Sequence, residues 1–341
     1  MNRRDKNSDQ YNPANERIKY KYRQHLRRIG QKDEKTILAA LKHIRDFEIF
    51  MSFAGFEKFN DHVADKYIQA MFNANLSLSC ITDNIRALKD FLNWLERQRG
   101  YRSRLNYNHI DYLNISRNQR KTAKATEYQK AYRYDQIIQA IRQMPGETDK
   151  EKRDKAIVSL QALCTLRISE LRTVKMNSLV EEDGQYFIYV SPKNMSVKFA
   201  NTRHAVFIPL PNDIIANVIE WHRYLRSLGF RDADPLFPRV DNHFAQTNLL
   251  QQTIRKEEIK SNTTIRGIFK NAFESAGFGY IKPHSFRKTL ARYAETQSPA
   301  FLNAVRQNLG HMSIDTTLNS YGQLSVLEQR RIISGAKLGL A

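Results

Sequence analysis

The residues with the clearest chemical potential lie in the last sixty positions of the chain. His284 and Arg287 stand three residues apart, His311 follows Leu309-Gly310, and Tyr321 comes ten residues later. Arginine presents a planar fork that can bind two phosphate oxygens, and histidine can move a proton near neutral pH. A tyrosine hydroxyl can attack phosphorus when neighbouring cations stabilise its anion. Together these groups could cut and rejoin a phosphodiester without a metal ion.

A further arginine stands upstream, in the run Leu166-Arg167-Ile-Ser-Glu170-Leu. The residues before it are mostly apolar, and a charge in such surroundings is costly unless it is paired. Glu170, three residues later, is the expected partner and would direct the guanidinium. Each feature alone is typical of ordinary structure: an ion pair at a helix start, a polar helix end, or one of 16 tyrosines. The interpretation therefore depends on their joint order.

The composition favours a polyanionic partner. The chain of 341 residues has 55 Lys and Arg against 35 Asp and Glu, a net charge of +20 that is spread over both halves. Such an excess points to nucleic acid. Cys80 and Cys164 form no CxxC motif, so neither a metal site nor a disulfide framework is expected. We find no apolar leader and no apolar run long enough to span a membrane. We therefore expect a cytoplasmic protein of a prokaryotic cell, or one that reaches DNA by another route.

The first part of the chain predicts a helical unit. Residues 1–15 are polar and are expected to be flexible. Residues 16–110 show helical periodicity at 33–53, at 61–72 with Asp61 as N-cap, and in a helix that Ser77 or Ser79 opens and Gly100 ends. Residues 111–131 are expected to be a basic linker that could follow DNA phosphates. Its candidate DNA-binding residues are Arg117, Arg120, Lys121 and Lys124, and Lys198, further along the chain, is a fifth candidate.

The second part predicts a mixed domain from residue 132. A buried helix is expected at 151–164, and strands at 186–190 and 205–208 flank a polar connection that carries Lys193 and Lys198. Further helices are expected at 212–228, 262–276, 284–296, 299–309 and 324–337, with Gly310 in the left-handed position that ends a helix. The predicted fold is mainly α with a small β-hairpin or sheet, in two domains.

The ordered set resembles the tyrosine recombinase family, also called phage integrases. Its elements are Arg167-x-x-Glu170, a lysine in a hairpin, His284-x-x-Arg287, Leu-Gly-His311 and Tyr321. The resemblance covers about residues 132–325 and implies an α+β catalytic domain at 132–322. It also implies that residues 16–110 form a helical core-binding domain. A C-terminal helix at 323–341 would dock on a neighbouring protomer or fold back on its own domain.

The resemblance implies a role for each site residue. Arg167 and Arg287 would clamp the scissile phosphate, and His311 would bond to a phosphate oxygen. His284 would act as a base toward the tyrosine or as a phosphate ligand. Tyr321 would form a 3′-phosphotyrosine bond and release a 5′-hydroxyl.

The remaining roles fall to one carboxylate and one lysine. Glu170 would orient the region of the first arginine. The general acid would be a hairpin lysine within reach of the leaving oxygen, and Lys193 is favoured over Lys198 because it directly follows the strand. A phosphotyrosine keeps the energy of the phosphodiester, so no metal, ATP or other cofactor is expected. The expected partners are double-stranded DNA, further copies of the chain in a tetramer on paired DNA sites, and, where a reaction requires them, accessory DNA-bending proteins; no membrane is involved.

The sequence therefore favours a site-specific DNA recombinase or integrase of a mobile genetic element. A type IB topoisomerase-like enzyme would share the tyrosine chemistry but would relax supercoils as a monomer. A non-catalytic DNA-binding protein on the same fold is the third interpretation. The compact helical N-terminal part and the Leu-Gly-His turn favour the recombinase, and the complete residue set argues against loss of catalysis.

Overall fold

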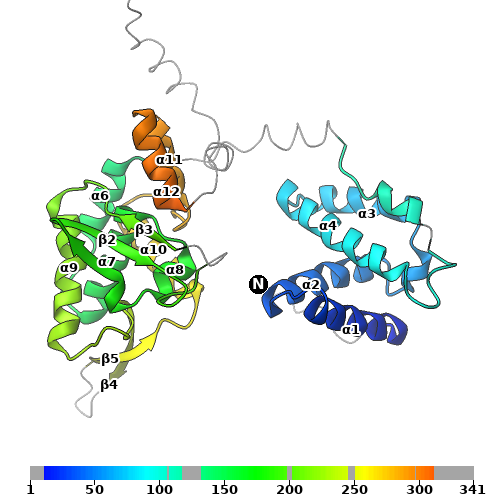
Figure 1. Cartoon of the computed structure of the whole chain (residues 1–341), viewed down its shortest axis with the longest axis horizontal. Helices are drawn as coiled ribbons and strands as arrows, with labels where there is room; N and C mark the ends of the chain where they lie inside the picture. Colours follow the sequence, from blue (N-terminus) through cyan, green and yellow to red (C-terminus); the bar gives the residue numbers. More distant parts are fainter. Residues whose placement is uncertain are drawn as a thin grey trace, which may run out of the picture. The chain divides into compact units, whose positions relative to one another are not determined.

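The computed structural model describes residues 11–105, 107–116, 132–197, 202–244, 250–295 and 297–310. The chain forms two compact units, Met1–Gln129 and Lys130–Ala341 (Figure 1). Each unit has its own apolar core. Helices dominate the described parts of both units, and the strands found there belong to two small antiparallel sheets of the second. The mainly α fold with a small β component is thus confirmed. None of the helices in these ranges has the length and apolarity to cross a membrane.

The described helices of the first unit are α1 (Pro13–Arg28), α2 (Glu34–Phe50), α3 (Asp61–Asn73) and α4 (Leu78–Leu95), with short 3-10 turns at Phe56–Lys58 and Tyr107–Tyr112. Apolar stripes of all four α-helices meet in the core. Ser77 caps α4, as the sequence allows. At α3, however, the capping residue is Asn60, whose side chain accepts from the Val63 amide, so Asp61 is the first helical residue instead of the N-cap.

The flexible segment expected at residues 1–15 is wrong for residues 13–15, because α1 begins at Pro13. The Asn12 side chain accepts from two amides of the first turn, and proline suits that turn because its missing N–H would be unpaired there. Asn15 is fully buried and donates to Glu48 Oε1 at 3.1 Å and to Ala54 O at 3.0 Å. These signals are polar, so a search for apolar periodicity does not detect them.

The packed part of the first unit continues past residue 110. Leu113 and Ile115 are buried in its core, although both belong to the stretch 111–131 expected to be a linker. The four candidate DNA-binding residues of that stretch, Arg117, Arg120, Lys121 and Lys124, lie outside the described residues.

The described helices of the second unit are α6 (Tyr134–Gln143), α7 (Asp149–Cys164), α8 (Ile168–Thr173), α9 (Asn212–Ser227), α10 (Asn262–Ser275), α11 (Ser285–Glu295) and α12 (Pro299–Leu309). Every residue from Ala156 to Cys164 is buried, so α7 is the central helix, and α9 and β3 pack against it. The helices expected between 151 and 309 are confirmed to within two residues at each end, and α6 is additional. The helix expected at 324–337 lies outside the described residues.

The main sheet has the order β1 (Leu179–Glu182), β2 (Gln185–Val190), β3 (Arg203–Val206), all antiparallel. Ile188 and Ala205 are paired and buried on its inner face. The strand expected at 205–208 ends earlier, because the Ile208 amide donates to Leu163 O of α7. A two-stranded hairpin, β4 (Pro238–Phe244) with β5 (Leu250–Glu258), was not expected, and neither was β1, since these strands are polar and alternate weakly.

Helix α12 is fastened to the sheet and to α11. Helices α11 and α12 lie side by side (Figure 1). Their apolar residues, among them Leu290 and Leu309, share a small core of their own. Asn308 accepts from the Val206 amide at 2.6 Å and donates to Val206 O at 2.9 Å, so its side chain extends the edge of β3. Gly310 ends the helix with φ 64°, which confirms the predicted left-handed position.

Candidate active site

The first arginine of the predicted set stands at the start of α8. Arg167 Nη1 donates to Glu170 Oε1 at 3.0 Å, and the Arg167 amide donates to Glu170 Oε2 at 2.8 Å. The ion pair inferred from their spacing is therefore present. The chain reaches Arg167 through Thr165, which ends α7 in the left-handed region at φ 50° and ψ 48°. A β-branched residue is strained there, and such strain is commonly found at functional sites.

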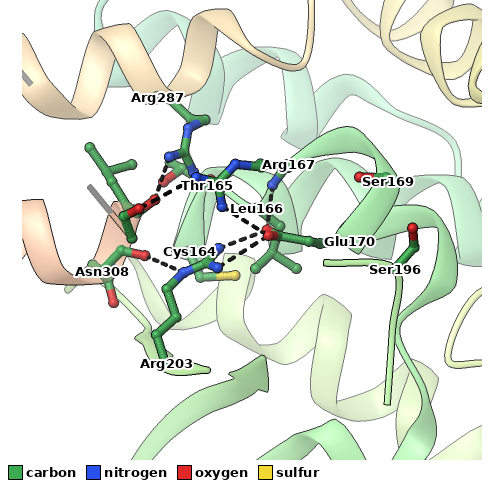
Figure 2. A network of polar contacts seen from close by, with 12 residues as sticks. Cys164, Thr165, Leu166, Arg167, Ser169, Glu170, Ser196, Arg203, Arg287 and Asn308 are labelled. Atoms are coloured by element: carbon green, nitrogen blue, oxygen red, sulfur yellow. Dashed lines mark hydrogen bonds and ion pairs between the residues drawn. The ribbon is translucent and has the colours of Figure 1, made fainter. Parts of the chain in front are cut away.

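Glu170 has a second guanidinium partner that the sequence motif does not include. Arg203, the first residue of β3, donates from Nη1 to Oε1 at 3.1 Å and from Nη2 to Oε2 at 2.7 Å (Figure 2). Burial works to raise the pKa of the Glu170 carboxyl, but Arg203 and then Arg167 outweigh it and hold that pKa below its usual value. Residues two apart in a strand point to the same face, so Arg203 points to the same side as buried Ala205. A charge on that inner face needs a partner, and this alternation in the sequence could have identified Arg203.

Three arginines from distant parts of the sequence meet at the end of α12. Arg203 Nε donates to Asn308 O at 2.9 Å (Figure 2). Arg287 Nη2 donates to Leu309 O, and Arg167 Nη2 donates to Gly310 O at 3.4 Å. The last carbonyls of a helix lack partners within it and form the negative end of its dipole. The three guanidinium groups donate to these carbonyls and place positive charge at the negative end of the dipole. Both interactions favour their position at the end of α12. We call this group, Arg167, Arg203 and Arg287, the arginine cluster.

Arg287 is the most deeply buried member of the arginine cluster. Only 1% of the residue is exposed, and its Nη1 donates to Thr165 O at 2.8 Å. Its contacts thus join the end of α7 to the end of α12. The strained Thr165 turn aims a carbonyl at this guanidinium, which gives the turn a structural role beside Arg167.

His284 precedes α11 and lies among the same charges. Burial, followed by the positive charges of Arg287, Lys288 and Arg167, lowers its pKa from 6.5 to about 4. The imidazole is therefore neutral at pH 7. This is the protonation state that a base or a phosphate ligand needs, and the lowered pKa at the same time weakens the affinity of the ring for a proton.

One buried glutamine ties His284 to Arg167 through the backbone. Gln161 Nε2 donates to Leu166 O at 3.0 Å and to Pro283 O at 2.9 Å. These carbonyls belong to the residues directly before Arg167 and His284. Gln161 is fully buried on α7, and nothing in the local sequence distinguishes it from an ordinary polar position.

The lowered pKa of His284 leads to a measurable pH dependence. The unfolded chain takes up this proton near pH 6.5, whereas the folded protein takes it up only near pH 4. The unfolded state binds more protons between these values, so the contribution of His284 to the free energy of unfolding decreases as pH falls from 6.5 to 4. In an NMR titration of the DNA-free protein, we expect the His284 ring to change shift near pH 4, and at a higher pH in Lys288→Met. A midpoint at or above 6.5 in the wild type would contradict this assignment.

The structure thus brings Arg167, Glu170, His284 and Arg287 together. Lys193 is exposed in the turn after β2, on the connection whose far end carries Arg203. The other residues expected in the site, Lys198, His311 and Tyr321, lie outside the described residues.

Comparisons with known proteins agree on one family. A sequence model of the phage integrase family matches residues 127–327. Tyrosine recombinase XerC 1 of Ralstonia nicotianae is 24% identical over 192 residues, which cover 55% of this chain and 54% of that protein. Tyrosine recombinase XerC of Ralstonia pickettii is 22% identical over 236 residues, covering 68% and 66%. The matches therefore span about half to two thirds of these relatives.

Solved structures show the same fold. XerH site-specific recombinase, in a post-cleavage complex with a palindromic difH substrate, has a TM-score of 0.63 at 16% identity, covering 88% of this chain and 79% of that one. A lambda integrase tetramer bound to a Holliday junction has a TM-score of 0.62 at 15% identity, covering 92% and 83%. The Tn1549 transposon integrase in complex with transposon right end DNA has a TM-score of 0.56 at 15% identity, covering 93% and 98%.

Proposed function

This chain belongs to the phage integrase family, and from that premise we propose that it is a site-specific DNA recombinase that cuts and rejoins strands through a 3′-phosphotyrosine. The observation that carries the proposal is the meeting of Arg167 and Arg287 at the end of α12, with a neutral His284 close enough to feel the charges of both. Tyr321 follows Gly310 by eleven residues. The proposed nucleophile thus belongs to the segment that leaves the arginine cluster.

The charges of the site suit a reacting phosphodiester. Three guanidinium groups and the Glu170 carboxylate leave two net positive charges at the end of α12. A phosphodiester carries one negative charge, and more charge builds on its oxygens when a nucleophile adds. Preorganised cations stabilise that added charge more than the ground state, which is the requirement for catalysis.

In the proposed reaction, one phosphate ester bond forms for each one that breaks. The Tyr321 oxygen attacks phosphorus and its proton passes to a base, for which neutral His284 is suited. The bond from phosphorus to the 5′ oxygen breaks, and a lysine of the β2–β3 connection, Lys193 or Lys198, protonates that oxygen. One phosphate ester replaces another, so the reverse steps rejoin a strand without ATP. Glu170 orients Arg167, and His311 contributes a hydrogen bond to a phosphate oxygen.

Double-stranded DNA and further copies of this chain are the proposed partners. The net charge of +20 supports a DNA partner, and the fold is shared with proteins solved on DNA, including the lambda integrase tetramer on a Holliday junction. Within this proposal, the first unit acts as a core-binding domain and the second unit carries the catalytic site. The enzyme would serve a mobile element in the cytoplasm of a prokaryotic cell, where its DNA lies.

The decisive experiment uses a nicked suicide substrate that contains DNA from the flanks of the host element. Cleavage next to the nick releases a short fragment and traps the enzyme on DNA. We expect an SDS-stable adduct, and peptide mapping by mass spectrometry should find the nucleotide on Tyr321. A protein that relaxes supercoiled plasmid as a monomer, without a paired site, would be topoisomerase-like, and absence of any adduct would indicate a non-catalytic DNA-binding protein.

The C-terminal segment gives a second test of the proposal. Val326, Leu327, Ile332 and Ile333 alternate with charged residues, which is typical of an amphipathic helix that docks on another surface. If residues 324–341 link protomers on DNA, their deletion should leave duplex binding largely intact and should abolish recombination. Gel-shift and two-site recombination assays measure the two effects, and an unchanged recombination yield would remove this role.

A further inference from the structure

We propose that Arg203 is a positioning residue of the strand-transfer site, and that it keeps Arg167 available to the DNA phosphate by holding Glu170. The proposal rests on the function proposed above. It concerns a residue outside the sequence motif, and its basis is the geometry of the arginine cluster.

All three guanidinium nitrogens of Arg203 are committed to protein acceptors. Nη1 and Nη2 each donate to one oxygen of Glu170, and Nε donates to Asn308 O. The Arg203 side chain is 7% exposed, against 21% for Arg167. Arg203 is therefore placed to hold other groups, whereas Arg167 keeps an exposed part that can meet a ligand.

The Glu170 carboxylate is fixed because each oxygen serves both arginines. Oε1 accepts from Arg203 Nη1 and Arg167 Nη1, and Oε2 accepts from Arg203 Nη2 and the Arg167 amide. Four directed bonds leave this buried carboxylate no freedom to rotate. Without Arg203, Glu170 would be held by Arg167 alone, and its orientation would no longer be set from two sides.

Arg203 also determines the charge that Arg167 presents. With both arginines, the group formed with Glu170 carries one net positive charge. Without Arg203, the buried carboxylate would neutralise Arg167, and the pair would offer no net charge to a phosphodiester. Stabilisation of an anionic transition state depends on that charge. Arg203 thus acts on the reaction through Glu170.

The same side chain fixes the end of α12. Arg203 and Val206 are the first and last residues of β3, and both bond to Asn308, one through its carbonyl and the other through its side chain. A Cβ on Gly310 would stand 3.0 Å from Arg203 Cδ, so the arginine packs closely against the turn. His311 and Tyr321 follow that turn in the sequence. Arg203 therefore contacts both Glu170, the partner of Arg167, and the turn at Gly310 that ends α12.

The test measures single-turnover adduct formation on the nicked substrate at saturating DNA. Arg203→Met should be about 100-fold slower than wild type, because displacement of a catalytic group by about 1 Å costs that much. Arg203→Lys, which keeps the charge but not the fork, should be roughly tenfold slower. Adding Glu170→Gln to Arg203→Met removes the neutralising carboxylate and should recover roughly tenfold, since Arg167 regains its charge. A purely structural role for Arg203 gives no reason for this rescue.

Arg153→Met is the matched control. Arg153 is also buried, and it also bonds to a carboxylate, that of Asp154, and to a carbonyl, Pro238 O, but on the side of α7 that faces β4. Arg153→Met should lower the melting temperature about as much as Arg203→Met does. Its rate of adduct formation should fall by less than about threefold. Thermal unfolding and duplex binding are measured for every variant, so that loss of fold and loss of chemistry are separated.

The outcomes distinguish the inference from the function on which it rests. If the wild type forms no adduct, the proposed function fails and the inference fails with it. If the wild type reacts but Arg203→Met slows no more than Arg153→Met, or the added Glu170→Gln gives no recovery, Arg203 has no positioning role while the function stands. If Arg203→Met does not fold, Arg203→Lys decides: a roughly tenfold slower adduct supports the inference, and a wild-type rate overturns it.

Discussion

Replacing Tyr321 by phenylalanine should abolish the covalent adduct with nicked DNA, while duplex affinity stays within about twofold of wild type because phosphate contacts by basic residues supply it. The change removes one oxygen, the atom that would bond to phosphorus. Loss of a nucleophile lowers turnover by about 10⁴-fold or more. The measurement is SDS-stable adduct against time, with DNA binding followed by fluorescence anisotropy.

Tyr280→Phe is the matched control for this prediction. It also removes one phenolic oxygen from the second unit, from a half-buried residue between α10 and α11. This variant should form the adduct at the wild-type rate. Adduct that persists in Tyr321→Phe would mean that another residue is the nucleophile. Equal loss in both variants would mean that a general effect on the fold explains the result.

Replacing Glu170 by alanine should lower the free energy of unfolding of the second unit by about 3–5 kcal/mol. The change removes a fully buried carboxylate and leaves the guanidinium groups of Arg167 and Arg203 together without their anion. Removing one partner of a buried ion pair costs this much, because the remaining charge is desolvated and uncompensated. Urea denaturation measures the effect.

The control for Glu170→Ala is Glu34→Ala in the first unit. Glu34 also binds two arginines, Arg23 and Arg27, but all three side chains are substantially exposed. Water can solvate the charges that remain, so the loss of stability should be several-fold smaller than for Glu170→Ala. Similar losses at both sites would contradict the assignment of Glu170 as a buried bridge between arginines.

The two tryptophans allow each unit to be followed separately. Trp94 lies in the first unit and Trp221 in the second, and the chain has no others. In a Trp94→Phe background, fluorescence reports the unfolding of the second unit. In a Trp221→Phe background it reports the first. Each stability change is then referred to the unit that contains the substitution, since a chain with two units need not unfold in one step.

The sequence predicts the elements that bury an apolar stripe and misses those whose signals are polar. Helices α2 and α4 follow directly from periodicity, and α7 follows from its run of apolar residues. Helix α1 begins earlier than expected because Asn12 caps it and Asn15 is buried through hydrogen bonds, and the β4–β5 hairpin consists of mainly polar strands joined by backbone pairing. Periodicity detects burial against a core, and it says little about elements stabilised by capping or by backbone pairing.

For the site, short-range spacing was informative and long-range geometry was not. The pairing of Arg167 with Glu170 follows from three residues of separation. Arg203 reaches the same carboxylate across 33 positions, and Gln161 reaches Pro283 across 122. Such contacts depend on how the strands and helices pack, which a single sequence does not display. The roles of Lys193, Lys198, His311 and Tyr321 remain predictions.

The end of α12 has one more physical consequence. Three guanidinium groups repel one another when they share a poorly solvated space, and gathering them around an arriving strand would oppose its binding. Here the carbonyls of 308, 309 and 310 and one carboxylate already hold them in place. The electrostatic cost of bringing these like charges together is therefore part of the free energy of folding. It does not reduce the affinity for an incoming DNA strand.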